Sequence, residues 1–225
     1  TAVAINDKYA IVSAAGEDFG SSQDEAGAAY IFEQDNLGTW NEVQKIVSSD
    51  RDEMDNFGVS VSISGDYAMV GANREDEDET GANREPDAGA AYVFERNNAG
   101  KWNEVQKLVA SDRMRDVQFG ISVAIGTKYA ISGTPLDSFG SAYIFERGNG
   151  GQWSEMKKLL TSDRNINWFG SSVALSANYA IVGAPNESED ENGQNTADFA
   201  GSAYIFEGPA IIVGSDEMPS SYGIN

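Results

Sequence analysis

One sequence pattern occurs four times along this chain, and it restricts the fold more than any other feature. Each copy contains a Tyr-Ala dipeptide, then an acidic segment, then the string Ala-Tyr-Ile-Phe-Glu or a close variant. The first of these tyrosines are Tyr9, Tyr67, Tyr129 and Tyr179, and those of the longer string are Tyr30, Tyr92, Tyr143 and Tyr204. Three copies continue into a polar segment that begins with Trp40, Trp102 or Trp153, spaced 62 and 51 residues apart. A repeat of roughly 40 to 60 residues that carries several strands is typical of a β-propeller or a similar array.

Each copy contains four segments with the composition of β-strands. The first segments are residues 3–5, 59–63, 121–125 and 172–175, the second are 9–12, 67–70, 129–131 and 179–182, and the third are 29–32, 91–94, 142–145 and 203–206. The second and third segments are apolar at consecutive positions, which is typical of strands that are covered on both faces, as in stacked blades. The Trp-led fourth segment, such as 102–109, mixes charged and aliphatic residues as a half-exposed outer strand does.

We therefore predict an all-β fold, a β-propeller of four blades with about four antiparallel strands each. One domain covers residues 1–225, with repeats at approximately 1–56, 57–118, 119–168 and 169–225. The last repeat is abridged, because only four residues separate Glu207 from Ile212, where the other copies have the Trp-led hairpin. Tyr222-Gly223 aligns with Phe57-Gly58, so that a closed ring would bring the two chain ends together. The alternative is a piece of a longer array, and the lack of an initiator Met suggests a trimmed chain.

The composition excludes much of the usual chemistry of enzymes. The chain has no Cys and no His, so disulfides, thiolate zinc sites and His-dependent triads are ruled out. Oxygen ligands remain for hard cations such as calcium. A net charge of −21 repels nucleic acid and anionic lipid, and no apolar stretch is long enough to cross a membrane. We expect no nucleic-acid partner and no membrane insertion.

A second set of motifs carries a resemblance to a known family. Phe57-Gly58, Phe119-Gly120 and Phe169-Gly170 are each followed some dozen residues later by a Gly-Ala or Gly-x-Pro element, such as Gly183-Ala184-Pro185. This pattern resembles the FG-GAP repeat of integrin α-chain propellers, which is also found in bacterial cell-surface proteins and in some fungal lectins. The resemblance spans the whole chain and implies a β-propeller that binds protein or glycan ligands outside the cell.

The chain departs from that family in two ways. The family's calcium cage, of the type Asp-x-Asp-x-Asp-Gly, usually separates the first strand from the second. Here the connection has only three residues, such as Ser64-Gly65-Asp66, which is too short to surround an ion with several oxygens. The resemblance also implies seven blades, whereas this chain has material for four.

Two other acidic segments are the candidate metal sites. They join the second and third strand segments of the second and fourth copies, and their alternating carboxylates are ligands that calcium accepts. The candidate calcium ligands are Glu75, Asp76, Glu77, Asp78, Asp87, Glu187, Glu189, Asp190 and Asp198. The alternative is a solvated acidic loop, since neither segment has the spacing of an EF-hand.

Other recurring residues have a structural interpretation. Asp-Arg pairs stand before each Phe-Gly, at 50–51, 112–113 and 163–164, and we interpret them as turn or inter-blade links. The repeated tryptophans are interpreted as packing residues of an outer hairpin, with an aromatic platform for sugars as the minority alternative. Trp168 breaks the repeat, because Asn56 and Gln118 hold its position in other copies. It is therefore a candidate ligand-binding residue.

These observations favour a non-catalytic extracellular or cell-surface module, acting in adhesion or surface assembly and binding protein or glycan through loops at one face of the propeller. One alternative is a calcium-assisted lectin. Another is a structural subunit of a filament or larger surface complex, which self-associates through the open edge of the incomplete last blade. A hydrolase would need two carboxylates converging in a pocket, and the sequence nominates no such pair.

Overall fold

The computed structural model describes residues 1–18, 25–161, 167–188 and 199–207, which form fifteen β-strands in four antiparallel sheets. The first sheet contains β1 (Val3–Ile5), β2 (Tyr9–Ala14), β3 (Ala28–Gln34) and β4 (Trp40–Ile46). The second contains β5 (Ser60–Ser64), β6 (Tyr67–Ala72), β7 (Ala90–Arg96) and β8 (Trp102–Leu108). The third contains β9 (Ser122–Ile125), β10 (Tyr129–Thr134), β11 (Ser141–Arg147) and β12 (Trp153–Leu159). The fourth contains β13 (Ser172–Leu175), β14 (Tyr179–Ala184) and β15 (Ser202–Glu207).

We call these sheets blades 1 to 4. Within each blade the strands follow one another in chain order as an antiparallel meander. The third and fourth strands of blades 1, 2 and 3 shift register at equivalent places, after Ile31, Val93 and Ile144. The prediction of an all-β fold built from blade-like repeats is confirmed. The described residues contain no helix long and apolar enough to cross a membrane.

The burial of the strands follows from the stacking of the blades. In blade 2, every residue of β6 after Tyr67 is buried, because blades 1 and 3 cover both of its faces. In β14 of blade 4, by contrast, Ala180 and Val182 are buried against blade 3, whereas Tyr179 and Ile181 are exposed. Consecutive apolar residues of a strand are therefore all buried only where a blade lies on each side of the sheet.

The Phe-Gly motif fixes each blade to the one before it. Phe57, Phe119 and Phe169 are fully buried, and each makes edge-to-face contacts with a Tyr and a Phe of its own third strand. Their backbones form parallel bridges to a glycine of the preceding blade, for example between Phe119 and Gly89. A Cβ atom at Gly89 would collide with the carbonyl of Phe119, so this approach requires glycine.

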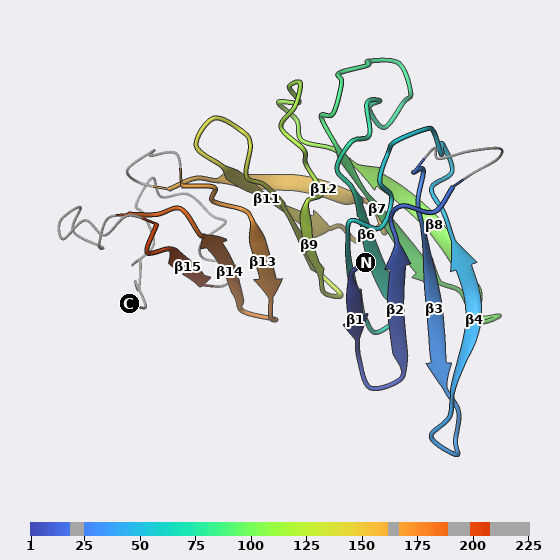
Figure 1. The fold of residues 1–225 in the computed structure, drawn as a ribbon. Coiled ribbons are helices and arrows are strands. Elements are labelled where there is room, and N and C mark those ends of the chain that lie inside the picture. The colour runs from blue at the N-terminus through green and yellow to red at the C-terminus, as the bar shows by residue number, and fades with distance from the viewer. Residues whose placement is uncertain (19–24, 162–166, 189–198, 208–225) are drawn as a thin grey trace.

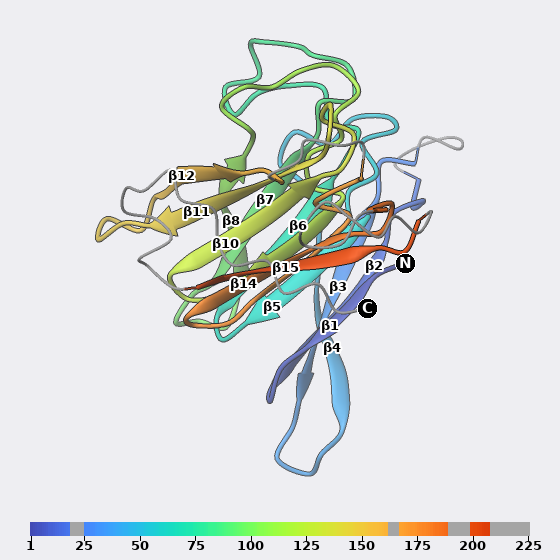
Figure 2. The same ribbon diagram turned by 90° about the vertical axis from the view of Figure 1, so that its left-hand side faces the viewer.

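The blades follow one another as an open fan. The innermost strands pack in sequence, β1 against β5, β5 against β9 and β9 against β13. Figure 1 shows the β13–β15 sheet at one side of the fan and the β1–β4 sheet at the other, separated by the two middle blades. In the side view of Figure 2, β4 and the turn before it project beyond the other blades. The ring expected from the alignment of the chain ends is therefore not closed in the described part of the chain, since blades 1 and 4 lie apart.

Candidate binding groove between the second and third blades

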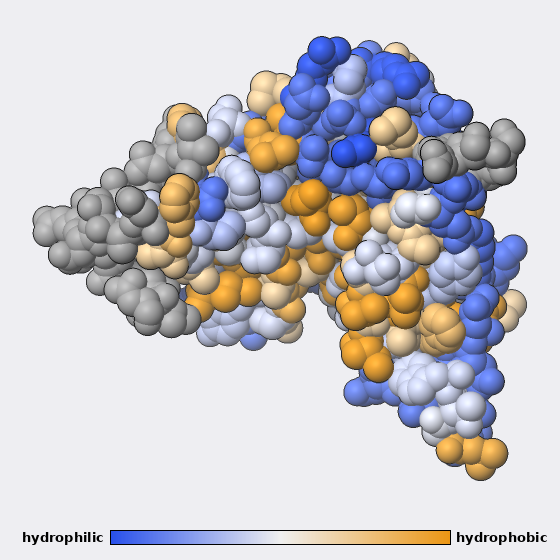
Figure 3. All heavy atoms as spheres, viewed as in Figure 1, coloured by the Kyte–Doolittle hydropathy of each residue, from blue (hydrophilic) through white to orange (hydrophobic). Residues whose placement is uncertain are grey.

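The longer loops lie at one edge of the blades. In an antiparallel meander, the connection from the second to the third strand and the connection from the fourth strand to the next blade emerge on the same side. These loops are at the top of Figure 1, whereas the β1–β2 and β3–β4 turns lie at the bottom. We call the upper edge the loop face. Figure 3 shows that hydrophilic residues dominate it where the acidic loop 73–89 of blade 2 lies.

One carboxylate follows the second strand of every blade. These residues are Glu17, Glu75, Asp137 and Glu187. Glu75 is almost fully buried; its carboxylate lies 3.1 Å from Nζ of Lys107 and 2.8 Å from the hydroxyl of Tyr92. The same ammonium lies 2.7 Å from Asp50 of blade 1, so the ion pairs connect two blades. Burial and the neighbouring charges of Glu75 and Asp50 raise the pKa of Tyr92, which therefore stays protonated.

Blades 2 and 3 share an equivalent network. The Nζ atom of Lys158 lies 2.8 Å from Asp112 and 2.5 Å from Asp137. Tyr143 donates its hydroxyl to Asp112 at 2.6 Å. The repetition of the network at successive blade junctions identifies these carboxylates as structural groups that link blades.

The arginines of the Asp-Arg pairs hold the loops that follow the second strands. Arg113 donates from Nη1 to the carbonyl of Asn83 and from Nη2 to the carbonyl of Asp76, both at 2.9 Å. Arg51 donates from Nη2 to the carbonyl of Glu17 at 3.2 Å. The structural interpretation of these pairs is confirmed at 50–51 and 112–113, and the third pair lies outside the described residues.

Three carboxylates of the acidic loop, those of Glu75, Asp76 and Asp78, accept contacts from other residues of the loop. Asp78 accepts hydrogen bonds from the Thr80 hydroxyl at 2.7 Å, from the backbone N–H groups of Thr80 and Ala82 at 2.8 and 3.1 Å, and from the Asn83 amide. The Thr80 hydroxyl and these other donors hold the pKa of Asp78 well below its usual range. Asp76 forms an ion pair with Arg84 at 2.9 Å. These contacts explain how a loop rich in like charges keeps a defined shape.

The predicted calcium ligands do not gather around one point in this conformation. Among the residues that the structure describes, no three carboxylates form a group that could hold a metal ion. The carboxylates of Glu75 and Asp78 are bound as described above. Glu77 donates its backbone N–H to Glu75, and Asp87 donates its backbone N–H to Asp76. Glu187 is buried and accepts the Asn167 amide at 2.8 Å. The remaining candidates, Glu189, Asp190 and Asp198, lie outside the described residues, so calcium binding stays a prediction.

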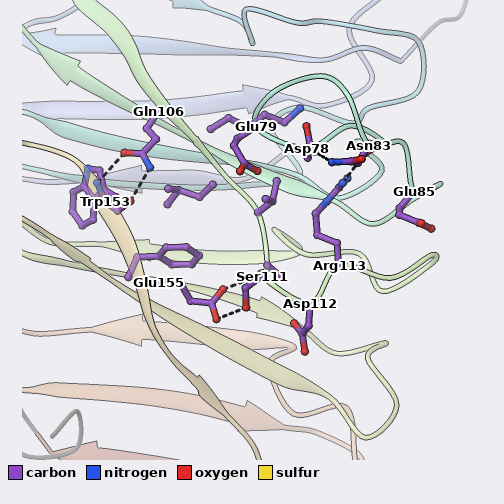
Figure 4. Close-up of a pocket in the computed structure, with 15 residues that line it drawn as sticks. Asp78, Glu79, Asn83, Glu85, Gln106, Ser111, Asp112, Arg113, Trp153 and Glu155 are labelled. Carbon is purple, nitrogen blue, oxygen red and sulfur yellow. Dashed lines mark hydrogen bonds between the residues drawn. The ribbon is translucent and has the colours of Figure 1, made fainter.

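A groove of about 630 Å³ runs between the outer strands of blades 2 and 3, beneath the acidic loop. Figure 4 shows Gln106 and Trp153 at one end of it and Asn83 with Arg113 at the other. The Gln106 side chain closes its end by bonding the backbone of Trp153, accepting its N–H at 2.8 Å and donating to its carbonyl at 2.7 Å. A concave site of this size is typical of ligand-binding pockets in proteins.

The groove has a negatively charged rim. Phe145, Leu108 and Trp153 lie at its base and are each only 3% exposed. Glu155, which follows Trp153 on β12, is bound by the N–H and hydroxyl of Ser111, both at 2.8 Å. The rim residues Glu79 and Glu85 are exposed. Their side chains make no hydrogen bond or ion pair within the described ranges, so their charges are available to a ligand.

Trp168 lies on the loop face and is 45% exposed. Its φ angle is +56°, a conformation that is uncommon for a bulky side chain. Asn56 and Gln118 have almost the same φ, so the repeat imposes the backbone and only the aromatic ring is particular to this blade. Phe139, from the neighbouring loop of blade 3, is also exposed. The structure does not bring Trp168 into the groove, and the two are separate candidate sites.

One buried carboxyl group, Asp55, is not among the residues predicted from the sequence. Burial, together with the nearby charge of Glu75, raises the pKa of Asp55 to about 8. Its carboxylate accepts the backbone N–H of Asp52 at 2.7 Å. The equivalent residues before Phe-Gly are Val117 and Asn167. The sequence did contain a signal for Asp55, because the other copies have an apolar or amide side chain where this copy has an acid.

A protein-family model matches a large part of the chain. The family model described as FG-GAP repeat matches residues 40–94, 102–145 and 153–206, which is more than half of the chain. The three matches begin at Trp40, Trp102 and Trp153, so each runs from the outer strand of one blade into the third strand of the next. No curated protein matches the chain.

Proposed function

The chain belongs to the FG-GAP repeat family, and from this premise we propose that it is a non-catalytic module that binds a ligand outside the cell. FG-GAP repeats are typical of extracellular interaction and adhesion modules. In this proposal the ligand contacts the loop face and enters the groove between blades 2 and 3. Loops on a rigid scaffold are common binding elements, because they vary while the strands stay fixed.

The chemistry of the groove favours a positively charged segment of a protein as the ligand. The observation that carries the proposal is the pair of free carboxylates, Glu79 and Glu85, on the rim of a groove with apolar residues at its base. Lys or Arg side chains place an aliphatic stem on apolar surface and a charged end at carboxylates. The net charge of −21 would accelerate the encounter with such a partner.

Trp168 supports a second candidate function, that of a lectin. An exposed indole with one apolar face and one polar N–H suits a ligand that is both flat and hydroxylated. Calcium assistance is a separate part of this alternative and depends on the carboxylates of the second and fourth copies, in 75–87 and 187–198. A glycan array probed with and without a chelator tests it, and Trp168→Ala should abolish any signal found there.

The groove is tested with heptalysine as a probe, by fluorescence anisotropy at low and moderate salt. The double variant Glu79→Gln/Glu85→Gln should weaken binding about fivefold, since two exposed ion pairs contribute about 0.5 kcal/mol each. The matched control is Asp7→Asn/Glu42→Gln, which removes the same charge from exposed positions of blade 1 that do not line the groove. Equal losses in both variants would mean that heptalysine responds only to net charge, and the groove would then be rejected as the site.

A further inference from the structure

Three successive blade junctions in this chain are built in the same way. Each blade presents a forward face to the next blade, formed by a Tyr and an aliphatic residue two positions later in its second strand. Each blade presents a rear face to the preceding one, formed by two aliphatic residues of its first strand. The forward pairs are Tyr9 and Ile11, Tyr67 and Met69, Tyr129 and Ile131, and in blade 4 Tyr179 and Ile181. The rear pairs are Val61 and Ile63, Val123 and Ile125, Val173 and Leu175, and in blade 1 Val3 and Ile5.

One forward face and one rear face have no neighbour in the described part of the chain. Ile11 on an occupied forward face is fully buried, whereas Ile181 is 36% exposed. Ile63 on an occupied rear face is 7% exposed, whereas Ile5 is 67% exposed. Figure 3 shows hydrophobic residues on both sides of the notch between the two ends of the fan. The fan therefore ends in two apolar surfaces of different composition.

The aromatic residues show that these two surfaces match each other. At the first junction the ring of Tyr9 meets Trp102 of the next blade edge to face, with centroids 5.4 Å apart. At the second junction Tyr67 meets Trp153 at 6.1 Å. Tyr129 at the third junction has no such partner, because blade 4 has no Trp-led outer strand in the described residues. Tyr179 on the free forward face is half-exposed, and Trp40 of blade 1, which has no preceding blade, is partly exposed. Tyr179 and Trp40 therefore have the residue types and positions that one further Tyr–Trp contact needs.

The glycines support the same conclusion. A Cβ atom at Gly133 on the forward face of blade 3 would collide with the carbonyl of Gly170 in blade 4. That carbonyl also accepts the hydroxyl of Ser122 at 2.7 Å. Gly183 occupies the equivalent position on the free forward face, yet a Cβ there would meet only Ser172 of its own blade. Blade 4 thus keeps the small residue that a junction requires, without a described neighbour.

We propose that a second copy of this chain covers these surfaces, with the forward face of blade 4 in one copy packed on the rear face of blade 1 in the next. The two free surfaces are the missing halves of a junction that the chain itself builds three times, which selects a second copy over an unrelated partner. The contact is heterologous, so it closes into a ring of copies or continues as an array. It uses the faces of the blades and differs from pairing at the open edge of blade 4.

Sedimentation velocity over a range of concentrations tests this proposal with one variant for each surface. Ile181→Asp blocks the forward face, and Ile5→Asp blocks the rear face. Each should weaken association about a hundredfold, because an unpaired charge is buried in the contact. Leu37→Asp, at a turn residue that is 92% exposed, is the matched control and should associate as the unaltered protein does. Circular dichroism checks that the variants fold.

Mixing the two variants distinguishes head-to-tail contact from other modes. Ile181→Asp still has a free rear face and Ile5→Asp still has a free forward face, so an equimolar mixture should form a dimer and nothing larger. A protein that remains monomeric at all concentrations overturns the proposal, because something other than a second copy would then cover the surfaces. Loss of association in only one of the two variants also overturns it, since that result indicates like-with-like contact.

Discussion

Asp55 allows a direct test of how burial and neighbouring charges at a blade junction affect stability. Its carboxyl group is buried beside Glu75, and its pKa is raised from 3.8 to about 8. In blade 4 the equivalent residue is Asn167, whose amide donates to Glu187, the counterpart of Glu75. A protonated Asp55 is the closest carboxyl analogue of that amide. We therefore predict that Asp55→Asn stabilises the protein at and above neutral pH.

The magnitude follows from proton linkage. Between pH 4 and pH 8 the folded state holds a proton on Asp55 that the unfolded state has lost, so the free energy of unfolding falls as pH rises. The slope from this one group is at most about 1.4 kcal/mol per pH unit, or about 6 kcal/mol over the whole interval. Because the acidic neighbours of Asp55 titrate together with it, we expect about half of that, roughly 3 kcal/mol at pH 8.

Urea unfolding followed by tryptophan fluorescence, at intervals from pH 4 to pH 9, measures this difference. The Asp55→Asn variant cannot ionise at that position and should lose less stability than the unaltered protein as pH rises, whereas the two should agree near pH 4. Asp7→Asn, at an exposed turn, is the control and should follow the unaltered protein within about 0.5 kcal/mol. Parallel curves for Asp55→Asn and the unaltered protein, or a less stable variant at pH 8, would refute the reasoning.

Two further predictions concern the packing of the blades. Lys107→Met leaves two carboxylates at the first junction without their cation, and we expect a loss of about 3 to 5 kcal/mol in urea unfolding, against less than about 0.5 kcal/mol for the exposed Lys101→Met. Gly133→Ala places a methyl group against the backbone of Gly170 and should cost about 2 kcal/mol or more in thermal unfolding, whereas Gly183→Ala should cost clearly less because only a serine side chain must move. Equal effects within either pair would contradict the structure.

The fold was predictable from the sequence because its cause is local and repeated. Strands such as Tyr67–Ala72 are apolar at consecutive positions, and only a sheet covered on both faces explains that pattern. The Phe-Gly motif was visible as well, although its reason was not. The glycine of the motif is needed because Gly120 has a φ of +91° and a Cβ atom there would collide with the carbonyl of Ala90. These two residues are 30 positions apart in the chain, so the sequence alone does not show that they meet.

The candidate site was less predictable, because the chemistry of a carboxylate depends on its neighbours in space. Glu75 and Asp78 look alike in the sequence, yet one pairs with a lysine of the outer strand and the other closes its own loop. The free acids of the groove, Glu79 and Glu85, cannot be told from them without coordinates. Trp168 was distinguishable, since an aromatic residue that breaks a repeat is visible in an alignment of the copies.

The sequence did not predict that the fan is open, because the alignment of the copies is the same for a closed ring and for an open fan. Each junction contributes a rotation between neighbouring blades, and the rotation depends on how side chains interlock and not on the strand pattern. The exposure of Ile5 and Ile181 shows that the fan is open, since a closed ring of four blades would bury both residues.

The central claim is that blades 1 and 4 do not meet within one chain, and distances between spin labels test it most directly. The chain has no cysteine, so labels can be placed at Asp7→Cys and Ala177→Cys, on equivalent turns of blades 1 and 4, with unlabelled protein in excess. Thr127→Cys with Ala177→Cys gives the reference for two neighbouring blades. We predict a clearly longer distance for the first pair than for the reference pair. Equal distances would mean that the four blades close into a ring, which would contradict the open fan.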